Sequence, residues 1–146
     1  MRLLFRLILL CAMGVRPAAA GLLDGLFPDD GIVPVEKALA LQPPLWDGNV
    51  LVLGWDIAPG CYLYRDKTII EAVEPVGQIL GQASWPAAQA YRDEHFGKVQ
   101  IYRNAVQVQF RPSKAVPTTL RIRFQGCAED KVCYPPQTRL VQVPAP

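Results

Sequence analysis

The sequence contains a single histidine, His95, and this scarcity excludes most histidine-dependent chemistry. A structural zinc site takes four ligands, usually as two close pairs, and a cysteine hydrolase needs a general base. A large excess of charge of either sign is also missing, since the sequence has 15 basic and 13 acidic residues. Residues 1–20 hold three of the basic residues and none of the acidic ones, which leaves a net charge of −1 for the rest. This balance argues against a nucleic-acid partner.

Long apolar runs are absent as well. The run Leu7–Met13 is too short to span a bilayer. It follows two arginines and precedes Ala18–Ala20, the small residues that a signal peptidase reads. We therefore expect residues 1–20 to be an export signal cleaved near Ala20–Gly21. Residues 21–146 should form one periplasmic domain with no membrane span after cleavage.

Four cysteines are present, and one of them, Cys11, lies in the expected signal. A lipid-modified signal at Cys11 is the competing interpretation, which Leu10 disfavours because such signals have a small residue there. After export, oxidising conditions favour a disulfide between the close pair Cys127 and Cys133. Cys61 is then the odd cysteine. We expect a buried, unpaired thiol, with a third exchange partner as the alternative.

Helix signals are missing, because no long amphipathic pattern occurs and 14 prolines suit loops and strand edges. Short apolar alternations separated by turn residues instead predict an all-β, antiparallel sandwich with one wet face per sheet. For Val35–Leu41, one helical turn and an edge strand both remain open. The expected strands cover residues 49–57, 61–64, 67–72, 76–80, 106–110, 120–124 and 140–143.

The cysteine pair encloses a loop of five residues. A disulfide across so small a loop stabilises a fold by only about 2 kcal/mol, which favours exchange chemistry over a structural role. Gly126 offers backbone freedom next to the pair. Lys131 would favour a thiolate, whereas Glu129 and Asp130 would oppose it. The C-x-x-C spacing of thioredoxin-like proteins is absent.

Three motifs together resemble a known family, the amino-terminal periplasmic domain of the thiol:disulfide interchange protein DsbD. They are residues 125–128 with 133–138, residues 60–65, and residues 93–98 with 101–103. The resemblance implies an immunoglobulin-like sandwich in which Cys127 and Cys133 cycle between disulfide and dithiol. It also implies electron transfer from a membrane-embedded thiol reductant to periplasmic thioredoxin-fold clients, including a disulfide isomerase and a cytochrome c maturation protein. The dithiol stores the electrons, so no metal or other cofactor is expected.

The same resemblance assigns roles to the two cysteines and to a short segment. Cys133 forms the mixed disulfide with the client, and Cys127 resolves it. Asp93, Glu94, His95, Phe96 and Gly97 match a cap loop that shields the disulfide. His95 stands where the family usually has a phenylalanine and Phe96 where it has a tyrosine, so either ring is a candidate shield.

Supporting roles fall to Tyr62, Tyr64 and Tyr134. Tyr62 and Tyr64 share one strand face by alternation, and Cys61 faces the other way. The resemblance makes Asp93 and Glu94 proton-handling groups, although a plain solvated turn is our preferred interpretation. The alternatives to an exchange domain are a binding module with a structural disulfide and a copper or zinc chaperone.

Overall fold

The structure is a computed structural model that describes residues 31–112 and 115–145. The expected export signal and its cleavage point lie outside these residues. In this part of the chain, strands dominate and no helix is long and apolar enough to cross a bilayer. The elements are α1 (Val35–Ala38), β1 (Leu39–Leu41), β2 (Leu45–Trp46), β3 (Leu51–Ile57), β4 (Cys61–Tyr64), β5 (Ile69–Glu74), β6 (Gln89–Asp93), β7 (Gly97–Tyr102), β8 (Ala105–Phe110), β9 (Thr119–Phe124), β10 (Gly126–Ala128), β11 (Val132–Cys133) and β12 (Gln137–Gln142).

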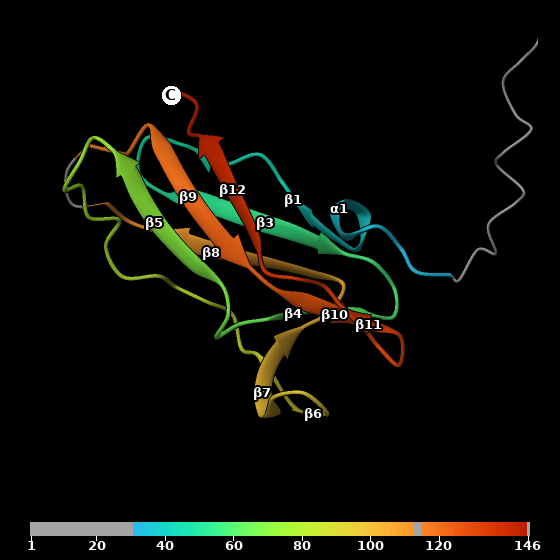
Figure 1. Cartoon of the computed structure of the whole chain (residues 1–146). Helices are drawn as coiled ribbons and strands as arrows, with labels where there is room; N and C mark the ends of the chain where they lie inside the picture. The colour runs from blue at the N-terminus through green and yellow to red at the C-terminus, as the bar shows by residue number, and fades with distance from the viewer. Residues whose placement is uncertain (1–30, 113–114, 146) are drawn as a thin grey trace, which may run out of the picture. The chain divides into compact units, whose positions relative to one another are not determined.

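Two antiparallel sheets enclose the main core. In the first, β3 pairs with β1 and β2 along one edge and with β8 along the other. The second has the order β12-β9-β5 and lies across the first, as Figure 1 shows. The ring centroids of Trp55 on β3 and Phe124 on β9 lie 5.8 Å apart between the sheets. Burial of such apolar faces is the main driving force for folding.

Period-2 alternation correctly predicts which faces are buried. Along β3, Leu51, Leu53, Trp55 and Ile57 are at most 4% exposed, and the residues between them are more accessible. On β9, the apolar residues are buried and the arginines between them are exposed. Val35–Leu41, left open above, contains both alternatives, because the helical turn α1 runs directly into the edge strand β1.

The strand expected at residues 76–80 is wrong. After β5 the chain makes a turn at Pro75–Gly77, and Val76 and Ile79 are 95% and 76% exposed. Apolar residues form a strand only where a neighbouring strand pairs with them. Here only Leu80 reaches the core.

A third sheet, with the order β11-β10-β4-β7-β6, carries the cysteine pair. Its strand β4 is buried on both faces. Cys61 and Leu63 pack into the main core, whereas Tyr62 and Tyr64 belong to a separate cluster with Ile101 and Cys127. The expectation for Cys61 is confirmed: the thiol is free, buried and directed away from the two tyrosines.

Gly126, at the start of β10, matters for a different reason from the one expected. Its φ is not in the left-handed region. Instead, a Cβ atom at this position would lie 2.1 Å from the carbonyl oxygen of Tyr62 and 2.9 Å from a methyl group of Leu39. Glycine is required because β10 and β4 approach closely here.

Candidate functional site

The two cysteines occupy opposite positions on β10 and β11 and form a disulfide, as expected. Their Cα atoms are 4.0 Å apart. Cys127 lies on the inner strand and is 1% exposed, whereas Cys133 lies on the edge strand and is half-buried. Asp130 has φ +58° in the connecting turn, a conformation that aspartate tolerates better than most residues. A visiting sulfur can therefore approach Cys133 more readily than Cys127.

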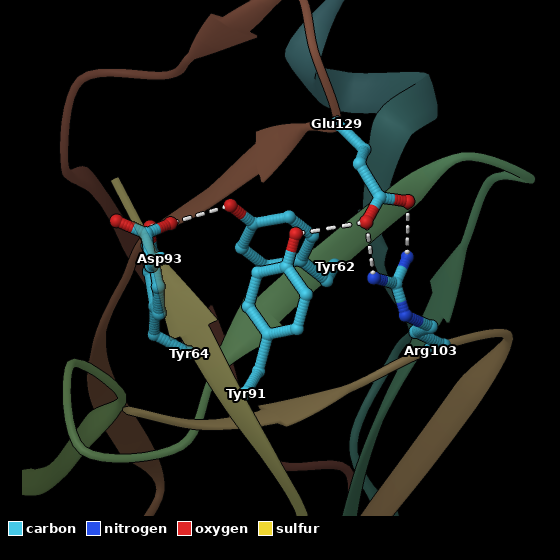
Figure 2. Close-up of polar contacts among 6 residues, drawn as sticks. All are labelled: Tyr62, Tyr64, Tyr91, Asp93, Arg103 and Glu129. Carbon is cyan, nitrogen blue, oxygen red and sulfur yellow. Dashed lines mark hydrogen bonds and ion pairs between the residues drawn. The ribbon is translucent and has the colours of Figure 1, made fainter. Parts of the chain in front are cut away.

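Beside the sulfurs, two tyrosines converge on one carboxylate (Figure 2). The hydroxyl groups of Tyr62 and Tyr64 each donate to Asp93 Oδ2 at 2.5 Å. The Tyr64 oxygen is also 3.0 Å from Cys127 Sγ and 3.9 Å from Cys133 Sγ. The Tyr64 hydroxyl hydrogen is directed at Asp93 and a disulfide sulfur carries no hydrogen, so Tyr64 and Cys127 are in close contact without a hydrogen bond in this form. In the dithiol form the Tyr64 oxygen is an acceptor for the Cys127 thiol.

Asp93 is 5% exposed, so the expectation of a plain solvated turn is wrong for this residue. Burial acts to raise its pKa, but hydrogen bonds from Tyr62, Tyr64 and two backbone N–H groups together lower the pKa to about 2. A free thiol has a pKa of about 8.5, so moving its proton to such a carboxylate is uphill by about 9 kcal/mol. Asp93 is better suited to hold the tyrosines than to store a proton. Glu94 next to it is exposed.

The turn after β6 is fixed by the same carboxylate. The backbone N–H groups of His95 and Phe96 donate to Asp93 Oδ1 at 2.7 and 2.9 Å. The Phe96 ring then packs edge-on against Tyr64, with centroids 5.3 Å apart, and Lys67 Nζ lies 3.5 Å from the Phe96 centroid. His95 is exposed, with its ring centroid 6.4 Å from that of Phe96. Phe96 is thus the ring that contacts the tyrosine touching both sulfurs.

A polar hollow of about 460 Å³ opens between the turn after β6 and the loop that joins the two cysteines, which we call the cysteine loop. Its walls are residues 91–95, residues 127–133 and Tyr62. The disulfide therefore lines a concave surface that a protruding segment of another protein can enter.

Sequence reasoning missed the contact among three residues that holds the cysteine loop. Glu129 accepts hydrogen bonds from both terminal nitrogens of Arg103, at 2.8 and 3.1 Å, and from the Tyr91 hydroxyl at 2.9 Å (Figure 2). Arg103 and then Tyr91 hold the pKa of Glu129 below its ordinary value. Tyr91 lies on β6, whose sequence holds too few apolar residues for alternation to reveal it.

Tyr134 lies elsewhere than its expected supporting role requires, and the Lys131 ammonium is engaged by a backbone carbonyl. Tyr134 belongs to the main core, where its hydroxyl donates to the Val33 carbonyl at 2.5 Å. It fixes the chain after Cys133 and is not in the tyrosine cluster beside the sulfurs. Lys131 Nζ donates to the Gly31 carbonyl at 2.6 Å.

Asp93, Cys127 and Cys133 place one oxygen and two sulfurs within 4.8 Å of one another, close enough to consider a metal. The carboxylate is a poor third ligand, because its two oxygens already accept four hydrogen bonds. A carboxylate has about four lone-pair positions. A metal would displace these bonds or be held by two thiolates alone, so the donor set does not favour one.

An antiparallel β domain with a disulfide on an edge hairpin, one sulfur buried and one accessible, defines a class: domains that exchange thiols and disulfides with other proteins. The family model described as "Thiol:disulfide interchange protein DsbD, N-terminal" matches residues 29–145. The chain belongs to this family of thiol–disulfide exchange domains, with Cys127 and Cys133 as its cysteine pair.

Relatives agree with this assignment. The chain is 39% identical over 114 residues to the thiol:disulfide interchange protein DsbD of Cronobacter sakazakii, which covers 77% of this chain and 19% of that protein. It is 36% identical over 148 residues to the DsbD protein of Photorhabdus laumondii, covering 99% and 24%. The chain therefore spans about a fifth to a quarter of the length of these relatives.

Two solved structures from Neisseria meningitidis share the fold. The crystal structure of the DsbD N-terminal domain in the reduced form has a TM-score of 0.70 and 32% identity, over 79% of this chain and 91% of that chain. The complex between the DsbD N-terminal and PilB N-terminal domains has a TM-score of 0.65 and 31% identity, over 77% and 88%. The expected immunoglobulin-like sandwich is confirmed by this likeness.

Proposed function

We propose that this domain works in the periplasm and passes reducing equivalents from a membrane-embedded thiol reductant of the DsbD type to thioredoxin-fold client proteins. The carrying observation is the unequal burial of the two cysteines: Cys133 is half-buried on the edge strand and Cys127 is 1% exposed. A disulfide with a purely structural role does not need one accessible cysteine beside a hollow. In Neisseria meningitidis, a relative forms a complex with a PilB N-terminal domain.

The exchange runs in two displacements. In the dithiol form, the Cys133 thiolate attacks the client disulfide, forms a mixed disulfide and releases one client sulfur as a thiolate. The Cys127 thiolate then attacks Cys133 Sγ, the intramolecular disulfide forms, and the second client sulfur leaves with the electron pair. The client gains two electrons, the domain loses two, and the protons of the dithiol end on the client sulfurs. The membrane reductant restores the dithiol by the reverse sequence.

The turn of residues 93–97 acts as a cap in this proposal. Attack on a disulfide requires the third sulfur to approach along the S–S axis. Phe96 packs on Tyr64 and lies 3.5 Å from Lys67 Nζ, which supports the proposal that it restricts this approach until a docked client displaces the turn. His95 lines the hollow and meets the client surface instead.

Trapping tests the proposal directly. A Cys127→Ser protein, made with Cys61→Ala so that one thiol remains, should accumulate mixed disulfides with thioredoxin-fold proteins from a periplasmic extract. The matched control is Cys133→Ser in the same background, whose remaining thiol is buried and should capture little. Equal capture by both variants, or by neither, would refute the assignment of Cys133 as the attacking sulfur.

The reduction potential separates this proposal from a binding module with a structural disulfide. Structural bridges lie below about −300 mV, whereas exchange proteins lie between about −270 and −180 mV. Equilibration with glutathione buffers, read by thiol labelling, measures it. A value below −300 mV would favour the structural role.

A further inference from the structure

Glu129 sits in the five-residue loop between the cysteines, two residues after Cys127, and its side chain is held from two neighbouring strands. The carboxylate forms a two-pronged ion pair with Arg103, which follows β7, and accepts the hydroxyl hydrogen of Tyr91 on β6. The Arg103 and Glu129 side chains are 26% and 33% exposed, so water screens the pair only in part.

Arg103 is itself held in place by aromatic rings. Its guanidinium carbon lies 5.3 Å from the Tyr62 centroid and 5.4 Å from the Tyr91 centroid. These two rings lie 5.2 Å apart, and Tyr62 packs on Tyr64 beside the sulfurs. Through Glu129 the cysteine loop is therefore tied to Tyr91 and to Arg103, which lies against Tyr62 (Figure 2).

Backbone contacts alone hold the hairpin weakly. The pairing of β10 with β11 comprises two residue pairs, Cys127 with Cys133 and Ala128 with Val132. β11 has two residues and lies at the edge of its sheet. Backbone hydrogen bonds from Glu129 to Gly60, from Lys131 to Ala128 and from Tyr134 to Gly126 also hold this segment. Among the loop's side chains, Glu129 contacts Arg103 and Tyr91, and Lys131 contacts Gly31. β10 is anchored by its pairing with β4, so the loop and the two-residue strand β11 are the part of this hairpin that side-chain contacts can hold in place.

We infer that Arg103, Glu129 and Tyr91 are positioning residues that keep Cys133 within reach of Cys127 after the disulfide has opened, which is the geometry the second displacement needs. This inference rests on the proposed function. We call the three side chains the loop tether.

Linkage fixes the sign of the effect. In the disulfide form the covalent bond already orders the loop, so the tether forms at little entropic cost. In the dithiol form the covalent bond is absent, so part of the tether's binding energy offsets the entropy lost on ordering the loop. The tether therefore stabilises the disulfide form more than the dithiol form, and its removal must weaken closure of the disulfide. By the same reasoning, a mixed disulfide on Cys133 resolves more slowly without the tether.

The test measures the equilibrium constant for disulfide closure against glutathione in Glu129→Gln, Arg103→Gln and the double variant. Each single variant should lower this constant about three- to tenfold, a rise of about 15 to 30 mV in reduction potential at 29.6 mV per tenfold. The double variant should match the singles rather than their sum, because the second change finds the tether already broken. Tyr91→Phe removes one hydroxyl and should give a smaller shift in the same direction.

Controls separate this effect from general destabilisation and from simple charge. Arg121→Gln breaks an exposed ion pair with Glu71 on another sheet and should leave the constant unchanged. Thermal unfolding of each oxidised variant shows whether it folds, and Tyr91→Phe remains informative if the charge variants do not. Opposite shifts in the two single variants that cancel in the double would mean that the pair acts through charge, and would overturn the inference. Unchanged constants would overturn it too. If the unmodified protein exchanges with glutathione as an exchange domain does, the proposed function survives either result.

Discussion

Replacing Asp93 by asparagine should destabilise the domain at neutral pH and much less at acid pH. The carboxylate accepts two tyrosine hydroxyls on one oxygen and two backbone N–H groups on the other. Asparagine has one carbonyl oxygen, so it can accept from the two backbone N–H groups only if its amide N–H groups face the tyrosine oxygens, and the charge-assisted bonds from both hydroxyls are then lost. The pKa of Asp93 falls from 3.8 to about 2 in the folded protein. At 1.36 kcal/mol per unit, the ionised form contributes about 2 kcal/mol to the free energy of unfolding.

The sign of the pH dependence follows from the depressed pKa. The contribution is fully present above pH 3.8, the pKa in the unfolded chain, and is lost as the pH falls through the folded value of about 2. Urea unfolding of oxidised wild type and Asp93→Asn, at steps from pH 7 to pH 2, measures the difference in free energy. We expect a gap of about 2 kcal/mol or more at pH 5 to 7, shrinking by about 2 kcal/mol on acidification to pH 2.

The neighbouring carboxylate provides the matched control. Glu94 is exposed, and Glu94→Gln should change the free energy of unfolding by less than about 0.5 kcal/mol at every pH. A gap for Asp93→Asn that stays constant from pH 7 to pH 2 would refute the electrostatic reasoning and would point to lost packing alone.

Two further substitutions test the cap and the close approach of β10 to β4. Phe96→Ala should speed reduction of the oxidised protein by a small thiol about fivefold, because the edge-on and cation–π contacts of Phe96 contribute about 1 kcal/mol to the closed turn. Thiol labelling measures this rate, and His95→Ala is the control. An unchanged rate for Phe96→Ala would contradict the shielding role. Gly126→Ala should lower the free energy of unfolding by about 3 kcal/mol or more, because its Cβ would lie 2.1 Å from the Tyr62 carbonyl oxygen. Gly54→Ala, whose Cβ would meet its nearest neighbour at 3.5 Å, should be far milder in the same thermal unfolding experiment, and similar losses for both would contradict the steric argument.

The sequence predicts best where the pattern is local. Alternation in β3 and β9 identifies the buried faces, because a half-buried strand repeats every two residues regardless of its partners. It fails at residues 76–80, where apolar side chains have no pairing strand, and at β6, where Tyr91 is the one large apolar side chain among polar neighbours. Both cases depend on residues distant in the chain.

The site divides along the same line. The cysteine pair is evident from its spacing, and the resemblance to the DsbD family brings in the tyrosines and the cap. The burial of Asp93 was not predictable, since an acidic turn looks solvated until tyrosines 29 and 31 residues away converge on it. Glu129 looked like an opponent of the thiolate, and only its pairing with Arg103, 26 residues distant, shows that its charge is balanced.

Strand β4 separates the hydrophobic interior from the site around the cysteines. One set of its side chains belongs to the hydrophobic interior and the alternate set to the redox chemistry, with a single backbone between them. Substitutions on the tyrosine side can therefore change the site without repacking the interior. The exception is Gly126 on β10, where an added methyl group would clash both with the β4 backbone at Tyr62 and with Leu39 in the hydrophobic interior.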